Sequence, residues 1–126
     1  MIDHVTIAVS DVEKSKLFYE AIFKPLAYKL SFGEENIFYA FEMGKGFLFE
    51  IAQYKGKTPI TGTHIAFRVD TKEKVDSFFE LAIKLGAKDN GKPGPRPEYT
   101  KNYYACFFYD LDGHNIEAVF DVFEKE

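Results

Sequence analysis

The first residues of the chain alternate in polarity with a period of two. In DHVTIAV (3–9), apolar side chains at positions 5, 7 and 9 alternate with His4, Thr6 and Ala8, which predicts a strand with one packed face and one more polar face. The histidine lies on the polar side. The next segment, SDVEKSKLFYEAIF (10–23), has apolar residues near helical spacing, Ser10 or Asp11 as N-cap, and Pro25 beyond its end. It predicts an amphipathic helix.

Three strand-like runs follow this helix, AYKLSF, NIFYAFE and GFLFEIAQ, separated by glycine-containing turns. The order βαβββ then starts again after a polar linker, YKGKTPITG. The second set consists of strand THIAFRV, helix TKEKVDSFFELAIKLG, a short strand AKDN, a proline- and glycine-rich loop GKPGPRPEYTKN, and strands YYACFFYD and HNIEAVFD joined through Asp112-Gly113. We therefore predict an α+β fold of two tandem modules, about residues 1–54 and 62–122, within one domain of residues 1–126.

The two modules also repeat residue by residue. At an offset of 60, eight positions are identical without a gap, among them His4 with His64 and Phe18 with Phe78. The last strands match at an offset of 67, which superposes Glu50 on Glu117. The seven additional residues are explained by the longer loop of the second module. Each module therefore supplies one imidazole and one carboxylate.

Composition narrows the possible partners. The 126 residues suit one domain, and a net charge of −4 with interspersed acids and bases offers no basic face for nucleic acid. No apolar run approaches the roughly 20 residues that cross a bilayer, so we expect no membrane partner. The single cysteine, Cys106, forms no internal disulfide and is expected to pack in a buried strand. These features predict a soluble, cytoplasmic protein.

Four residues have the chemistry of metal ligands. Strand alternation puts His4, Glu50, His64 and Glu117 away from the bulkier apolar faces, so both modules would direct them to the side that helices leave uncovered. Two nitrogen and two oxygen ligands suit one divalent Zn, Ni, Co, Mn or Fe ion per site. The alternative is that each is an ordinary solvated strand residue, and the set a relic of duplication.

With these motifs, the sequence resembles the vicinal oxygen chelate superfamily of glyoxalases, bleomycin-resistance proteins and extradiol dioxygenases. The resemblance covers nearly the whole chain and lies in MIDHVTIAVSDVEKSKLFYE, THIAFRV and DLDGHNIEAVF, which is similar to the frequent D-P-D-G-x-x-I-E of the family. It implies curved sheets around a shared metal-binding cavity, with His4, Glu50, His64 and Glu117 as ligands. It also implies a homodimer, in which the modules that form one cavity can belong to different chains.

A carboxylate at Glu50 makes the chain resemble lactoylglutathione lyase most closely. The resemblance then implies a metal-dependent lyase or isomerase that acts on a small substrate with vicinal oxygens through an enediolate-type intermediate, with Glu117 or Glu50 as the base. The substrate is open, because no separate glutathione motif is present. The alternatives are a non-enzymatic antibiotic-binding protein of the bleomycin-resistance type, and a dioxygenase, which would depend on ferrous iron and oxygen.

Further candidates surround these four residues. Arg68 lies on the His64 face, where it could hold an anionic substrate group or pair with a nearby acid. The long loop and its end offer Arg96, Tyr99 and Tyr104 for substrate binding, together with Tyr103, because such loops often line sites. His114 follows the Asp112-Gly113 turn and is expected to face water.

Overall fold

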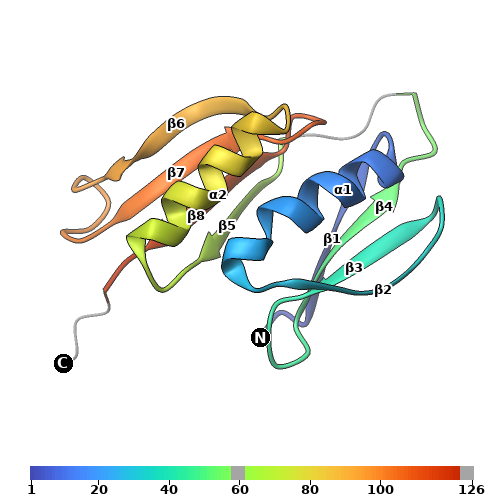
Figure 1. Ribbon diagram of the computed structural model, residues 1–126, viewed down its shortest axis with the longest axis horizontal. Coiled ribbons are helices and arrows are strands. Elements are labelled where there is room, and N and C mark those ends of the chain that lie inside the picture. Colours follow the sequence, from blue (N-terminus) through green and yellow to red (C-terminus); the bar gives the residue numbers. More distant parts are fainter. Residues whose placement is uncertain (58–61, 123–126) are drawn as a thin grey trace. The chain divides into compact units, whose positions relative to one another are not determined.

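The computed structural model describes residues 1–57 and 62–122. The chain forms two compact units, Met1–Thr61 and Gly62–Glu126, which are described separately (Figure 1). Each unit is a four-stranded mixed sheet with one α-helix packed against one of its faces. The predicted α+β class and the two βαβββ modules are confirmed.

The first unit begins with strand β1 (His4–Val9) and helix α1 (Val12–Ile22), followed by a 3-10 turn, η1 (Lys24–Leu26). Asp11 caps the helix by accepting the backbone N–H of Lys14 at 3.1 Å. Strands β2 (Lys29–Glu34), β3 (Phe38–Glu42) and β4 (Leu48–Gln53) complete the sheet in the order β1-β4-β3-β2. The β1–β4 pair is parallel, whereas β2–β3 and β3–β4 are antiparallel. Parallel strands need a long crossover connection, and here this connection contains the helix.

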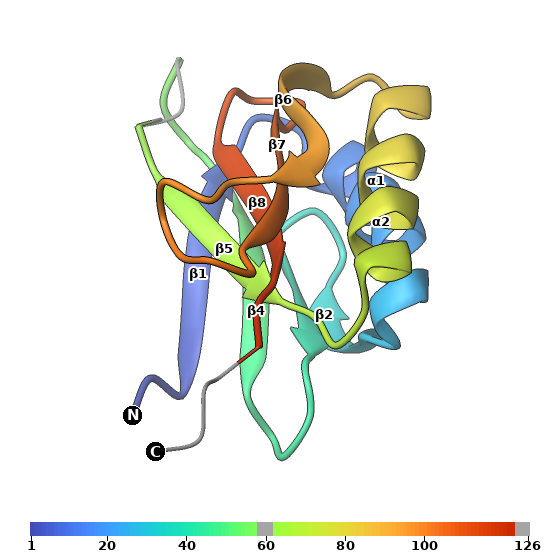
Figure 2. The same ribbon diagram turned by 90° about the vertical axis from the view of Figure 1, so that its left-hand side faces the viewer.

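The second unit repeats this topology with strand β5 (His64–Arg68), helix α2 (Lys72–Lys84), β6 (Lys88–Pro95), β7 (Tyr104–Tyr109) and β8 (Asn115–Phe120). Its strand order is β5-β8-β7-β6, with β5 and β8 parallel. Thr71 caps α2 through its side chain, which accepts the N–H of Lys74. In Figure 2, α2 is seen from the side next to the sheet of its own unit.

Strand β6 differs from the sequence prediction. Instead of a four-residue strand followed by a long loop, pairing with β7 continues to Pro95 and is interrupted by irregularities around Gly91. Gly91 has φ +149, and a Cβ there would lie 3.0 Å from the Phe107 ring and 3.2 Å from the Arg96 guanidinium. Edge strands tolerate such glycines and prolines, so composition alone suggested a loop where the structure has a strand.

The core of each unit lies between its helix and its sheet. In the second unit, Phe78 of α2 is fully buried and contacts the rings of Phe67 and Phe108, at 6.0 and 5.3 Å between centroids. Cys106 is also buried there, as expected.

Among the described residues, no helix is long and apolar enough to cross a bilayer. Because the helices take up the bulky faces, the four predicted ligands are left on the opposite faces of the sheets.

Candidate metal centre

The two modules present their histidine and glutamate at the same register. Thr6 is the Cα partner of Glu50 across β1 and β4, and Ala66 is the Cα partner of Glu117 across β5 and β8. His4 and His64 each precede that partner by two residues, so each shares a face with the glutamate of its own unit. The offsets of 60 and 67 in the sequence therefore correspond to one repeated arrangement of side chains.

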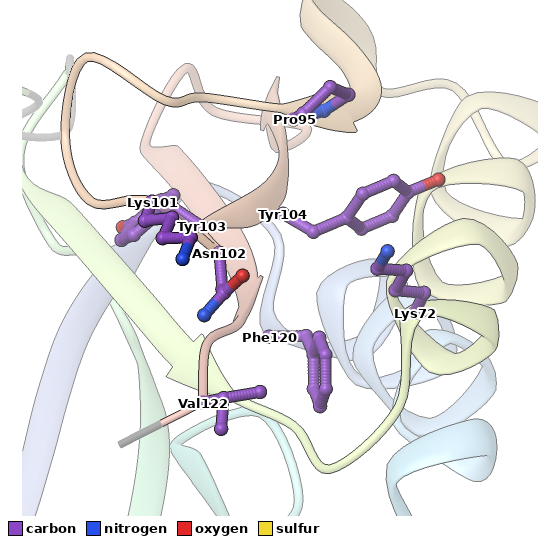
Figure 3. A pocket seen from close by; sticks show the side chains of 8 residues that line it. All are labelled: Lys72, Pro95, Lys101, Asn102, Tyr103, Tyr104, Phe120 and Val122. Carbon is purple, nitrogen blue, oxygen red and sulfur yellow. The ribbon is translucent and has the colours of Figure 1, made fainter. Parts of the chain in front are cut away.

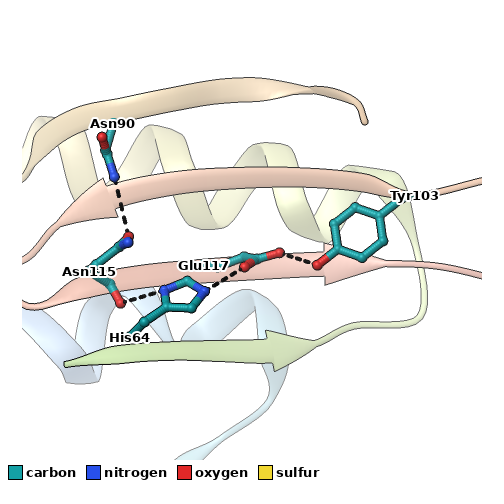
Figure 4. Close-up of polar contacts among 5 residues, drawn as sticks. All are labelled: His64, Asn90, Tyr103, Asn115 and Glu117. Atoms are coloured by element: carbon teal, nitrogen blue, oxygen red, sulfur yellow. Dashed lines mark hydrogen bonds and ion pairs between the residues drawn. The ribbon is translucent and has the colours of Figure 1, made fainter. Parts of the chain in front are cut away.

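In the second unit the pair is in direct contact. His64 Nε2 lies 2.9 Å from Glu117 Oε1, and His64 Nδ1 lies 3.2 Å from the backbone carbonyl oxygen of Asn115 (Figure 4). The Asn90 amide reaches the Asn115 side chain at 3.4 Å. The imidazole also stacks on Phe107, with the ring planes 24° apart. These contacts fix both the position and the rotation of the His64 ring.

Glu117 is a buried carboxylate, with 3% of the residue exposed. Its second oxygen, Oε2, accepts a short hydrogen bond of 2.5 Å from the Tyr103 hydroxyl. Burial raises the pKa of the Tyr103 phenol, and the bond to Glu117 raises it further. The phenol therefore stays protonated and acts as a permanent donor to the carboxylate.

The donor pattern of this pair fits a cation. If Nδ1–H of His64 donates to the Asn115 carbonyl, Nε2 carries a lone pair and faces a carboxylate oxygen of Glu117 at 2.9 Å. Two acceptors at that distance repel unless a proton or a metal ion lies between them. A histidine whose Nδ1–H donates to a backbone carbonyl leaves Nε2 for a metal ion, as is usual for metal-binding histidines.

In the first unit the histidine and the glutamate have different partners. His4 Nδ1 lies 2.7 Å from the Asp3 carboxylate, and Glu50 accepts the Thr6 hydroxyl at 3.1 Å. The hydrogen bond to Asp3, followed by the charge of Glu50, raises the pKa of the His4 imidazole. His4 is exposed and Glu50 partly exposed. As in His64, an oxygen acceptor occupies Nδ1 and leaves Nε2 for a metal.

No three histidine, cysteine, aspartate or glutamate side chains gather into a metal-binding group within residues 1–57 and 62–122. Each unit by itself offers a pair, which can provide two ligands and no more.

The predicted substrate residues have individual roles in the structure. Arg68 Nη1 donates to the backbone carbonyl of Asp121 at 3.1 Å. The Arg96 guanidinium donates to backbone carbonyls of Lys92, Gly94 and Pro95 and lies 5.5 Å from the centroid of Phe107. Phe107 also stacks with His64. Arg96 and His64 therefore both contact the Phe107 ring.

The tyrosines divide between the two faces of the sheet. Tyr99 is exposed and meets the ring of Tyr103 edge-to-face at 5.1 Å, so it lies near the Glu117 side. Tyr104 instead points to helix α2, where its hydroxyl donates to Asp76 at 2.7 Å. It lines a pocket of about 190 Å³ with seven other residues, among them Lys72 and Tyr103 (Figure 3). The structure therefore does not bring Tyr104 to the His64–Glu117 pair.

The structure places His114 and Tyr103 differently from what the sequence suggested. His114 is buried, with 1% of the residue exposed, so the expectation that it faces water is wrong. Its backbone N–H donates to Asp110 within the turn, and the turn folds its ring inward. Tyr103 was one of several candidate loop residues in the sequence, although its hydroxyl contacts Glu117 at 2.5 Å. What set it apart in the sequence was its position next to the predicted strand YYACFFYD.

Comparison with known proteins identifies the family. The model of the Glyoxalase/Bleomycin resistance protein/Dioxygenase superfamily matches residues 1–118, and the chain belongs to this superfamily. Metallothiol transferase FosB of Shouchella clausii is 26% identical over 119 residues, covering 93% of this chain and 77% of FosB. Fosfomycin resistance protein FosX of Listeria monocytogenes is 30% identical over 123 residues, covering 92% and 86%.

The fold is similar to that of solved members of the family. A glyoxalase/bleomycin resistance protein from Albidiferax ferrireducens matches with a TM-score of 0.84 and 26% identity, covering 96% of this chain and 99% of that chain.

Proposed function

We propose that this chain is a metal-dependent enzyme that acts on a small molecule with two adjacent oxygen atoms. The observation that carries the proposal is the His64–Glu117 pair, in which an anchored imidazole faces a buried carboxylate at 2.9 Å. FosB is named a metallothiol transferase, and a solved structure of a FosX variant from Listeria monocytogenes contains Mn(II) and a dihydroxypropylphosphonic acid. Both relatives support a divalent metal in this family.

The residues that would hold the metal are His64 and Glu117, together with His4 and Glu50 of the first module. Two imidazoles and two carboxylates suit Mn, Fe, Co, Ni or Zn. When bound, such an ion acts as a Lewis acid that polarises the oxygens of the substrate. We also propose that the protein is a cytoplasmic homodimer. In a dimer, the two modules that form one site can belong to one chain or to two.

The protein groups then supply orientation and proton transfer. A glyoxalase-like lyase or isomerase needs a base that removes a proton next to the substrate carbonyl, to form an enediolate-type intermediate. Glu50 and Glu117 are the candidates for this base, and their side chains differ in burial and in hydrogen-bond partners. Glu117 is buried and bonded to Tyr103, whereas Glu50 is partly exposed and bonded to Thr6. Arg68 and Arg96 add positive charge for an anionic substrate group.

The second candidate function is opening of the epoxide of a small phosphonate such as fosfomycin. The names of FosB and FosX, at 26% and 30% identity over more than nine-tenths of this chain, favour it. It uses the same metal ligands but requires an external nucleophile, water or a thiol, in place of proton removal next to a carbonyl.

The test combines metal binding with two activity assays. Dialysed protein is equilibrated with Mn, Fe(II), Co, Ni and Zn and its metal content is measured, for wild type, His4→Ala, His64→Ala and Glu117→Ala. Glu80→Gln, on the exposed side of α2, is the matched control. We expect about one metal per site in wild type and control, and loss in the three ligand variants. Wild type without metal would refute the proposal and favour an antibiotic-binding role.

Loaded wild type is then assayed with methylglyoxal hemithioacetals and, separately, with fosfomycin plus water or thiols. Turnover of the first substrate supports the lyase or isomerase, and turnover of the second supports the epoxide-opening function. In the active assay, Glu50→Gln and Glu117→Gln are compared. Each variant is assayed at a metal concentration that saturates it, and the base is the residue whose loss then still abolishes turnover.

A further inference from the structure

We propose that Tyr103 is a positioning residue, which holds Glu117 so that one carboxylate oxygen, Oε1, is presented to the metal beside His64. The inference rests on the proposed function. Its basis is that the two oxygens of Glu117 have different partners: Oε1 faces His64 Nε2 at 2.9 Å, and Oε2 accepts the Tyr103 hydroxyl at 2.5 Å (Figure 4). An unrestrained carboxylate can bind a metal through either oxygen or both.

Tyr103 is itself held by the loop from which it projects. Its backbone carbonyl accepts the N–H of Arg96 at 2.8 Å, and its own N–H donates to Thr100 at 3.2 Å. Its ring packs edge-to-face on Tyr99 at 5.1 Å. Because backbone and ring are both fixed, the hydroxyl has a defined position, and it transmits the geometry of residues 96–103 to the carboxylate.

The contact does not follow from the repeat. Strand pairing makes Phe107 the partner of Glu117 and Ala40 the partner of Glu50, so the position equivalent to Tyr103 in the first module is Asn36. In that module the hydroxyl for the glutamate comes from Thr6, which has Ala66 as its equivalent. The second module therefore obtains its donor from a different element, its longer loop.

Two roles of Tyr103 need to be separated. A buried carboxylate needs a hydrogen-bond donor for stability alone, and removal of such a donor lowers stability without any relation to a metal. A positioning role makes a further prediction, since removal of the donor frees Oε2 and changes the coordination of the ion. Outer-shell partners of metal ligands typically account for about 10- to 100-fold in metal affinity.

The experiment uses Tyr103→Phe, which retains the ring and removes the hydroxyl. Tyr104→Phe is the matched control, because the neighbouring tyrosine also donates to a carboxylate, that of Asp76 on the helix side of the sheet. Co(II) is the probe, since its visible absorption spectrum reports coordination number and geometry. Apparent Co(II) affinity, the spectrum, and urea unfolding of the metal-free protein are measured for each variant. Tyr103→Asn, the residue of the first module, is a second variant.

We expect both position-103 variants to bind Co(II) at least 10-fold more weakly than wild type and to give a changed spectrum. Tyr104→Phe should retain the wild-type affinity and spectrum, whatever it loses in urea. Folded Tyr103→Phe with unchanged affinity and spectrum would overturn the inference and leave the proposed function standing. If Tyr103→Phe does not fold, the same comparison is made with Tyr103→Asn, and failure of both to fold also overturns a pure positioning role. Wild type that binds no Co(II) overturns both proposals.

Discussion

Glu117→Gln separates the metal-binding role of this carboxylate from its structural role. Glutamine has the same shape, and its amide can satisfy both contacts seen in the structure: the N–H₂ group donates to His64 Nε2 and the carbonyl accepts from Tyr103. No buried group is left without a partner. We therefore expect the metal-free variant to unfold within about 1 kcal/mol of metal-free wild type.

The metal-loaded proteins should differ far more. A ligand at 100 times its Kd stabilises the folded state by about 2.7 kcal/mol. For a chain of 126 residues, 1 kcal/mol corresponds to roughly 3 to 5 °C in Tm, so saturating metal should raise the wild-type Tm by roughly 10 °C. Glu117→Gln loses a charged ligand, and its Tm should rise by no more than about 2 °C under the same conditions.

The assay is thermal unfolding followed by circular dichroism at pH 7.5, with chelator or with excess Mn(II) or Zn(II). Glu80→Gln, which removes the same charge from the surface of α2, should behave as wild type in both conditions. The reasoning is refuted if metal-free Glu117→Gln loses about 3 kcal/mol or more while metal still raises its Tm fully. That result would mean that Glu117 is the partner of a protonated His64 in a structural ion pair.

Three further predictions concern the scaffold. Burial raises the pKa of the Cys106 thiol to about 12, so a thiol reagent at pH 8 should react with it only after unfolding in urea, and fast reaction of native protein would contradict its burial. Phe78→Ala should cost about 3–5 kcal/mol in urea unfolding, because its ring is fully buried; a loss below about 1 kcal/mol would contradict the packing. Hydrogen bonds from Tyr39 and then from Asn36 lower the pKa of Glu13. The stabilisation is present above the unfolded pKa of 4.5 and is lost as pH falls through the lower folded pKa. Protection of the Asn36 amide from hydrogen exchange, measured relative to its intrinsic rate at each pH, should therefore fall at acidic pH in wild type and show no such acid-dependent fall in Glu13→Gln.

Much of the architecture was predictable because it depends on local patterns. Alternation with a period of two placed β1 and β4, helical spacing and caps placed α1 and α2, and the internal repeat paired His4 with His64 and Glu50 with Glu117. Since side chains two residues apart in a strand share a face, the sequence also predicted which face carries them. Strand β6 was underestimated, because its pairing depends on a partner strand and on bulges that composition does not show.

The sequence by itself determined the fold class, the two modules and the four residues with metal-binding chemistry, because these follow from periodicity and residue type. Only the tertiary structure decided which of these residues meet: that His64 contacts Glu117, that Tyr103 rather than Tyr104 reaches this carboxylate, and that His114 is buried. The physical reason is that such contacts join strands and loops far apart in the chain. Their distances are set by strand register and by the path of the loop, which no local pattern specifies.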